Sequence, residues 1–283
     1  MNSIIPPLGF ESSEFVVRTE RAQRLMKETD LDALLLTTEP EVRYFSGFHT
    51  SFWLSPTRPW FLIVPREGKP IAVIPEIGRA RMADTWLDEI ITWPAPRPSD
   101  EGITELTKTL NGLTKRSGII GLPMGTETHL RMPFSDFKKL QENIRNVDVV
   151  DATNLIQELR AIKSEAEISK IRYICQRVSE GFSELHKLIS VGDQEKEVFR
   201  KFRIDLLHRG ADEVPYLVGG SGPNGPTEVI GMPSNRTIKK GDVLMMDTGA
   251  VFDGYFSDFD RNFAFGHVDD EVSRAYDIVY RAT

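Results

Sequence analysis

The stretch MMDTGAVFDGYFSDFDRNFAFG, from Met245 to Gly266, predicts a β-hairpin that carries carboxylates on one face. Its turn is expected at Asp253-Gly254, because an Asp-Gly dipeptide between apolar runs favours a tight two-residue turn. That turn pairs Asp247 with Asp260, whereas a register shifted by two pairs Asp247 with Asp258. Residues paired across a hairpin share a face, so the three aspartates are expected on the same side in either register.

Three like charges on one face of a sheet repel one another unless a cation lies among them. The apolar flanks, 243–246 and 263–265, predict a buried sheet in which unpaired carboxylates are costly. Hard oxygen ligands suit Mn, Mg or Ca, and two carboxylates can share two cations in a hydrolytic site. The alternative is an acidic, solvated hairpin face without metal.

The residue types and their spacing resemble the metal-binding hairpin of the pita-bread metallopeptidases, the family of methionine aminopeptidase, aminopeptidase P, prolidase and the metal-free relative creatinase. The family pattern Asp-x-Gly-Ala, Gly-Tyr-x-Ser-Asp and Arg matches 247–250, 254–258 and Arg261. This resemblance implies that Asp247 chelates one metal and Asp258 bridges two divalent ions, with Mn expected first and Co, Zn or Fe as alternatives. Asp260, where the family often has threonine, is expected to be an outer-shell acceptor or an extra ligand.

In that family the remaining ligands, a His and two Glu, follow the hairpin on later strands. Here Thr283 ends the chain, and 269–281 has the apolar spacing of a short helix. His267 and Glu271 fit a loop and a helix start rather than the missing ligands. The resemblance therefore implies a chain truncated before the last ligands, with a glutamate beyond residue 283 as the general base. The 283-residue chain alone is expected to be inactive.

One loop before the hairpin departs from the family pattern. Peptidase members usually place a His three residues before a Pro, and counting back from Pro233 puts Ile230 in that position. That His normally contacts the substrate or the developing tetrahedral centre. Glu228 is a candidate replacement, the alternative being a solvent-facing loop glutamate. Together with Tyr255 and Arg261 of the hairpin motif, Glu228 and Ile230 form the candidate substrate-binding set.

The first half of the chain alternates strand-like and helix-like segments, which predicts an α/β layer architecture. The aromatic cluster from Tyr44 to Trp60 is expected to be mostly core, and Tyr44–Phe48 resembles a segment of the creatinase-type N-terminal domain. The expected strands are 33–36, 60–65, 70–75, 89–93, 118–122 and 147–150, and the expected helices are 15–27, 102–113 and 133–144.

A second domain is expected to start near residue 160, in a phrase that resembles the family's entry into the pita-bread domain. Ser164 and Glu167 form a predicted capping box at the start of a long helix, and 194–208 predicts another helix. The expected fold is thus an α/β creatinase-like N-terminal domain, residues 1–155, followed by an incomplete α+β pita-bread domain, residues 156–283.

Composition excludes several classes of protein. The net charge of −7 without a Lys/Arg-rich run argues against nucleic acid as a partner. No apolar run reaches the roughly 20 residues of a membrane span, and no signal peptide is recognised. The single cysteine, Cys175, excludes an internal disulfide and suits a reducing compartment, so a cytoplasmic protein is expected. The family resemblance adds the expectation of a homodimer.

The family resemblance implies a metal-dependent hydrolase of the Xaa-Pro aminopeptidase or dipeptidase type, which cleaves an amide bond in a small peptide-like substrate through a dinuclear metal-activated water. One alternative is a specialised relative, such as a creatinase-like amidinohydrolase, a cyclic-amide hydrolase or a sulfonium lyase, and Ile230 favours it. Another is a non-catalytic binding protein on the same fold. The retained pair of aspartates counts against that last alternative, because crowded carboxylates have no purpose without a cation.

Overall fold

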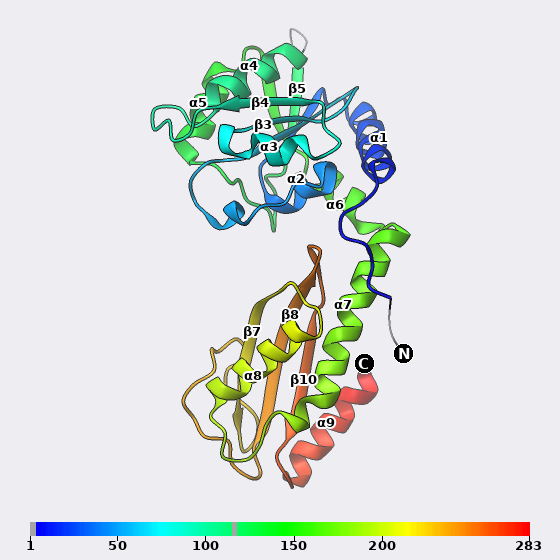
Figure 1. The fold of residues 1–283 in the computed structure, drawn as a ribbon, viewed down its shortest axis with the longest axis vertical. Coiled ribbons are helices and arrows are strands. Elements are labelled where there is room, and N and C mark those ends of the chain that lie inside the picture. The colour runs from blue at the N-terminus through cyan, green and yellow to red at the C-terminus, as the bar shows by residue number, and fades with distance from the viewer. Residues whose placement is uncertain (1–3, 115–117) are drawn as a thin grey trace. The chain divides into compact units, whose positions relative to one another are not determined.

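The computed structural model describes residues 4–114 and 118–283. It divides into two compact units, Gly9–Lys163 and Ser164–Thr283, and residues 4–8 group with the second unit (Figure 1). The domain boundary expected between residues 155 and 156 lies inside helix α6 (Thr153–Ala161) and remains a prediction. Each unit has its own hydrophobic core.

The first unit is built on a six-stranded mixed sheet with the strand order β4-β3-β2-β1-β5-β6. β1, β2 and β3 pair antiparallel, whereas the pairs β3–β4, β1–β5 and β5–β6 are parallel. Each strand lies within one residue of its expected bounds, so this part of the prediction is confirmed. The strands are β1 (Ala33–Leu36), β2 (Phe61–Pro65), β3 (Ile71–Pro75), β4 (Glu89–Trp93), β5 (Gly118–Leu122) and β6 (Val147–Asp151).

Helices cover both faces of this sheet, and the side chains of β1 alternate between them as the strand period requires. Leu34 and Leu36 pack with α1 (Ser12–Glu28), α2 (Glu39–Ser46) and α6. Ala33 and Leu35 pack with α4 (Ile103–Leu113) and α5 (Phe134–Asn143). Shorter helical segments are η1 (Ser51–Leu54), η2 (Glu76–Gly78) and α3 (Arg79–Ala83).

Helix α2 is, like α6, an element of this unit that the sequence did not predict. The sequence predicts that the aromatic cluster from Tyr44 to Trp60, which begins in this helix, is mostly core. This prediction is confirmed, because Tyr44, Phe45, Phe48, Trp53 and Trp60 are all buried. Pro40 in the first turn and the left-handed Gly47 at the end mark the helix boundaries.

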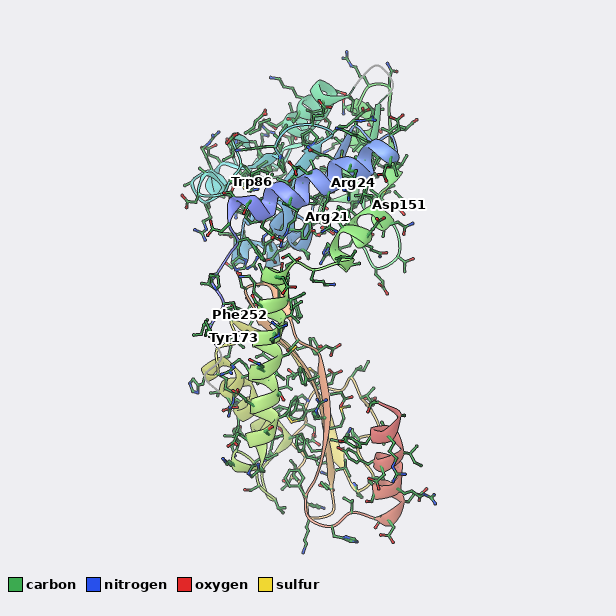
Figure 2. All side chains as sticks on the ribbon, turned by 90° about the vertical axis from the view of Figure 1, so that its right-hand side faces the viewer. Arg21, Arg24, Trp86, Asp151, Tyr173 and Phe252 are labelled. Atoms are coloured by element: carbon green, nitrogen blue, oxygen red, sulfur yellow. The ribbon has the colours of Figure 1, made fainter. Side chains whose placement is uncertain are left out.

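The second unit packs two helices against an antiparallel sheet with β8 at its centre. Tyr173 of α7 and Phe252 of β8 lie together in its core, with ring centroids 4.5 Å apart (Figure 2). Phe182 and Phe202 join the two helices, with centroids 4.6 Å apart. The elements are α7 (Glu165–Glu184), η3 (Leu185–Lys187), α8 (Glu195–His208), β7 (Glu213–Gly222), β8 (Val243–Phe252), β9 (Tyr255–Phe256), β10 (Phe259–Ala264) and α9 (Asp270–Ala282).

The start of α7 anchors the tip of the hairpin. The predicted capping box is present, because Ser164 Oγ accepts a hydrogen bond from Glu167 N and Ser164 N donates to Glu167 Oε2. Glu167 also accepts a hydrogen bond from the Tyr255 hydroxyl at 2.9 Å. Lys170 donates to Asp253 Oδ2 at 2.6 Å and to the carbonyl of Pro7.

The three-to-four spacing of Ile168, Ile171, Cys175, Val178, Phe182, Leu185 and Ile189 predicts an apolar stripe along this helix, but the buried face of α7 differs from it at the first turns. Lys170 is 1% exposed, whereas Ile168 and Ile171 are only partly buried. The polar groups at the tip of the hairpin lose solvent where they pack on α7, so they require hydrogen-bond and charge partners from that helix. At the first turns of α7, polar residues that supply these partners therefore face inward in place of the isoleucines.

The base of the hairpin is anchored by a second ion pair. Asp242 accepts hydrogen bonds from Arg236 Nη1 at 2.6 Å, Arg236 Nη2 at 2.8 Å and Lys239 N at 2.7 Å. The hydrogen bond from Arg236 lowers the pKa of the buried Asp242 carboxyl. Both ends of β8 are thus fixed by a cation.

We expect Lys170→Met to destabilise the second unit by about 3–5 kcal/mol, because it leaves a buried carboxylate without its ammonium partner. Urea unfolding measures the loss, and Lys170→Met/Asp253→Asn should recover part of it. Arg81→Met is the control, since Arg81 and Asp84 are 67% and 69% exposed and such a pair contributes at most about 1 kcal/mol. Equal losses in the single and double variants would contradict the role of the ion pair.

We expect Arg236→Gln to cost about 1–3 kcal/mol at pH 7, because a buried carboxylate loses its bidentate partner. The pKa of Asp242 is lowered by folding, so the pairing stabilises the protein above the ordinary Asp pKa of about 3.9. That stability is lost as the pH falls through the folded-state pKa. The difference between the unfolding free energies of wild type and variant should therefore shrink below about pH 4, and a constant difference would refute the assignment.

Candidate functional site

The hairpin adopts the first of the two predicted registers. Asp247 lies opposite Asp260, and Thr248 opposite Phe259. At the turn Asp253 has a φ of 48° and Gly254 a φ of 81°. A two-residue hairpin turn of this kind needs both central residues at positive φ, which Asp tolerates and Gly adopts freely.

The three aspartates gather on the face of the sheet opposite to α7 and α8. Met246 and Ala250 belong to the core under the helices, so Asp247 between them projects the other way. Asp258 lies just before β10. The register of β10 continues through it, since Ser257 N donates to the carbonyl of Ala250 at 2.9 Å, so the side chain of Asp258 is on the same face as that of Asp247. Asp260, two residues further on, shares the side of Asp258.

Two of these carboxylates, Asp247 and Asp260, have a raised pKa. Burial and then the charges of Asp260 and Asp258 raise the pKa of Asp247. Asp260 is exposed, so the buried sheet expected from the apolar flanks is not found at this edge strand. Partial loss of solvent around its carboxyl nevertheless raises the pKa of Asp260; the Arg261 guanidinium opposes this rise and Asp258 adds to it. Over the described ranges, 4–114 and 118–283, no side chain forms an ion pair with any of the three. A cation held between them would remove this repulsion.

Tyr216 of β7 completes the cluster, and the sequence analysis did not identify it. Its hydroxyl donates to Asp258 Oδ1 at 3.0 Å. Burial, this hydrogen bond and the charges of Asp258 and Asp247 raise the pKa of Tyr216 to about 12. The tyrosine therefore keeps its proton and orients the carboxylate. The sequence does not predict the position of Tyr216, because a long irregular connection separates β7 from β8 and no turn motif indicates that these strands pair.

Gly249 leaves the space that the Tyr216 ring occupies. The two residues lie opposite each other on β8 and β7. A Cβ built on Gly249 would lie 2.6 Å from Tyr216 Cζ, much closer than real contacts allow. The glycine of the Asp-x-Gly-Ala motif is therefore required by the ring that crosses it.

The other predicted site residues are not brought into this cluster. Tyr255 has its hydroxyl on Glu167 of α7. Arg261 lies opposite Met246, and its guanidinium lies 4.9 Å from the Phe259 ring centroid and donates to the backbone carbonyl of Asp260. Glu228 and Ile230 lie on the exposed connection between β7 and β8.

The donor chemistry of the cluster fits hard divalent cations, since all three side chains offer carboxylate oxygens. In the part of the chain that the structure describes, however, no group of three His, Cys, Asp or Glu side chains is arranged to hold a metal ion. Asp247, Asp258 and Asp260 therefore offer carboxylate oxygens to a cation, but the described residues do not form a complete set of metal ligands.

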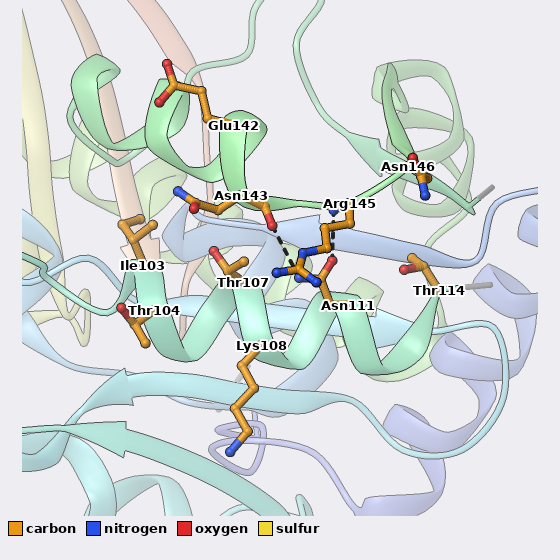
Figure 3. A pocket seen from close by; sticks show the side chains of 10 residues that line it. All are labelled: Ile103, Thr104, Thr107, Lys108, Asn111, Thr114, Glu142, Asn143, Arg145 and Asn146. Atoms are coloured by element: carbon orange, nitrogen blue, oxygen red, sulfur yellow. Dashed lines mark hydrogen bonds between the residues drawn. The ribbon is translucent and has the colours of Figure 1, made fainter. Parts of the chain in front are cut away.

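A polar groove lies between α4 and α5 of the first unit (Figure 3). Asn111 bridges it: Nδ2 donates to the carbonyl of Asn143, and Oδ1 accepts from Arg145 N. Its described lining, from Ile103 to Asn146, holds none of the residues singled out from the sequence. The groove is thus accounted for by the packing of two helices and a turn.

An α/β domain followed by an antiparallel sheet with a carboxylate hairpin defines a protein of the creatinase and prolidase class. Residues 18–162 match the Creatinase/Prolidase N-terminal domain, and residues 169–283 match Metallopeptidase family M24. The chain belongs to this family, whose members typically bind divalent metals. The resemblance and the fold class expected from the sequence are confirmed.

Several characterised and solved proteins are similar to the chain over most of its length. A probable dipeptidase, PepE, from Mycobacterium tuberculosis is 23% identical over 96% of the chain and 70% of its own length. A Xaa-Pro dipeptidase from Pyrococcus horikoshii is 26% identical over 94% of the chain and 69% of its own length. The prolidase structure from Thermococcus sibiricus has a TM-score of 0.81 at 25% identity, covering 95% of this chain and 70% of that one.

Across the described residues, the helices are all too short or too polar to cross a membrane. This agrees with the absence of a long apolar run in the sequence.

We expect Gly249→Ala to cost about 1–3 kcal/mol in urea unfolding, because the new methyl group overlaps the Tyr216 ring. In a Tyr216→Ala background the same substitution should cost nothing or stabilise the strand. A Gly249→Ala penalty that is the same in both backgrounds would show that something other than the ring requires the glycine.

Proposed function

We propose that the carboxylate cluster belongs to a metal-dependent amide hydrolase of the Xaa-Pro dipeptidase or aminopeptidase type. The observation that carries this proposal is the placing of Asp247, Asp258 and Asp260 on one sheet face, where none of them forms an ion pair with a described side chain. The substrate class is a small peptide or peptide-like amide. Membership of Metallopeptidase family M24 supports it.

In this proposal Asp247 and Asp258 hold divalent cations, and Mn is the first choice, with Co, Zn or Fe as alternatives. When bound, such ions activate water and polarise a carbonyl group. Asp260 acts as an outer acceptor or an additional ligand. Tyr216 fixes one oxygen of Asp258 and so leaves the other free for a cation.

The substrate side of the site is assigned to the connection between β7 and β8, with Glu228 and Ile230, and to Arg261 of β10. Tyr255 is better explained as an anchor of the hairpin on α7. A homodimer and a cytoplasmic location are further parts of the proposal, and both rest on the family resemblance and the composition.

Ile230 supports a second candidate function. An isoleucine cannot donate a hydrogen bond to a tetrahedral centre, so a specialised relative acting on a non-peptide amide or amidine fits this position. Such a protein would bind divalent metal without cleaving Xaa-Pro peptides.

The first test is hydrolysis of Ala-Pro by the protein purified from its natural source, in the presence and absence of added Mn²⁺ or Co²⁺, because the resemblance implies that the 283-residue chain alone is inactive. We expect Asp258→Asn to abolish metal-dependent turnover and to lower the bound metal measured by elemental analysis after dialysis. Asp269→Asn, an exposed carboxylate outside the cluster, is the matched control and should change neither. Unaltered metal content and activity in Asp258→Asn would refute the site. Metal binding by the wild type without any Ala-Pro cleavage would favour the specialised relative.

A further inference from the structure

The connection between β7 and β8 exposes an apolar tip. Val229, Ile230 and Met232 are 62%, 80% and 74% exposed. Large apolar side chains gathered at this exposure on a short segment are typical of a binding surface. We call residues 222–233 the apolar loop.

The apolar loop runs beside the strand that borders the carboxylates. Gly219 N of β7 donates to the carbonyl of Gly231 at 2.9 Å. Its neighbour Val218 lies opposite Asp247 on β8. With about 4.8 Å between neighbouring strands, the backbone at Gly231 lies about 10 Å from the strand of Asp247. A substrate seated at the carboxylates would thus be within reach of this loop.

A buried carboxylate holds both ends of the apolar loop. Glu195, the first residue of α8, is 4% exposed. Its Oε1 accepts from Ser221 N at 2.8 Å and Ser221 Oγ at 2.7 Å. Its Oε2 accepts from Ser234 N at 2.9 Å and Ser234 Oγ at 2.6 Å. One oxygen therefore binds the residue just before the loop, and the other binds the residue just after it.

The chemistry of this contact requires an ionised carboxylate. Burial opposes the charge, but the hydrogen bonds from Ser234 and Ser221 outweigh it and lower the pKa of Glu195. Arg236 Nη1 donates to Ser221 Oγ at 2.6 Å, so that hydroxyl has its own proton directed at Glu195. A glutamine at position 195 has one amide oxygen and would turn an NH₂ group toward donors at the other end.

We propose that Glu195 is a positioning residue: it holds the two ends of the apolar loop together and so sets the wall of the substrate site beside Asp247. The inference rests on the proposed function insofar as it names this loop as a substrate wall. Glu195 touches neither the substrate nor the carboxylate cluster, and it acts through the loop.

The test compares Glu195→Gln with Asp205→Asn, the same isosteric change on the same helix. Asp205 pairs with Arg209 at 2.5 Å and has no bond to the loop. Amide hydrogen exchange of the full chain is followed by mass spectrometry. We expect Glu195→Gln to speed exchange over 221–236 about tenfold or more, with the hairpin 243–264 unchanged, because the ends of the loop then open locally. Asp205→Asn should leave the loop protected.

A kinetic readout separates positioning from stability. In the protein purified from its natural source, assayed with Ala-Pro and Mn²⁺, Glu195→Gln should raise KM about tenfold and lower kcat by less than about threefold, because the metal-binding aspartates are untouched. A general loss of folded protein would lower kcat and leave KM unchanged. The control variant Asp205→Asn should show neither change in KM nor a large change in kcat.

The outcomes are distinct. Faster exchange confined to 221–236 together with a raised KM supports the proposal. Exchange that stays at the wild-type rate, or rises evenly over the second unit, overturns it, and so does local opening with an unchanged KM. If the wild-type protein from its natural source cleaves no Ala-Pro with either metal, the proposed function fails, and the exchange comparison alone decides whether Glu195 fixes the loop.

Discussion

The second unit is organised around the repulsion of three carboxylates on one face of a sheet. Asp247, Asp258 and Asp260 repel one another across this strand pair, so other contacts have to hold the two strands together. The fixing contacts lie at the two ends of β8, where a lysine from α7 and an arginine before the strand each bind one aspartate. The opposite sheet face adds apolar packing against α7 and α8. The two ends of β8 are thus held by ion pairs, whereas the negative charges of the carboxylate cluster between them are not neutralised by a described side chain.

The distribution of cations is the best argument that the cluster has a function. Asp242 and Asp253, on the same stretch of chain, each have a cationic side chain within 2.6 Å. Asp247, Asp258 and Asp260 have none among the residues that the structure describes. If all five were structural, the same solution would serve all of them. Asp247 is partly buried, whereas Asp258 and Asp260 are exposed, so their repulsion is partly screened by solvent. What remains of it still costs stability, and proteins accept such a cost where a ligand supplies the missing charge.

The parts of this structure that the sequence predicted are the local ones. The register of the hairpin follows from Asp253-Gly254, and the strands of the first unit follow from short apolar runs between turns. The contacts that the sequence could not predict join residues far apart in the chain: Tyr216 and Asp258 are separated by 42 positions, and Lys170 and Asp253 by 83. The periodicity of a sequence predicts which face of a helix or strand a side chain lies on, but it does not predict which distant residue that side chain contacts. At Lys170 it even favoured the wrong face, because a buried carboxylate changes which residue of the helix must turn inward.

The apolar loop constrains what the site can select. Its base is held by four hydrogen bonds to Glu195, whereas its tip offers Val229, Ile230 and Met232 to the solvent. The side chain of Ile230 cannot donate a proton or a hydrogen bond, and Tyr216, with a pKa of about 12, keeps its hydrogen bond on Asp258. The apolar side chains of Val229, Ile230 and Met232 can therefore discriminate only by apolar fit, and one methylene in such a contact changes selectivity by only about 1–3 kcal/mol. We infer that sharper selection among substrates has to come from groups that bind the polar ends of the substrate, and that the loop sets the size of the apolar part.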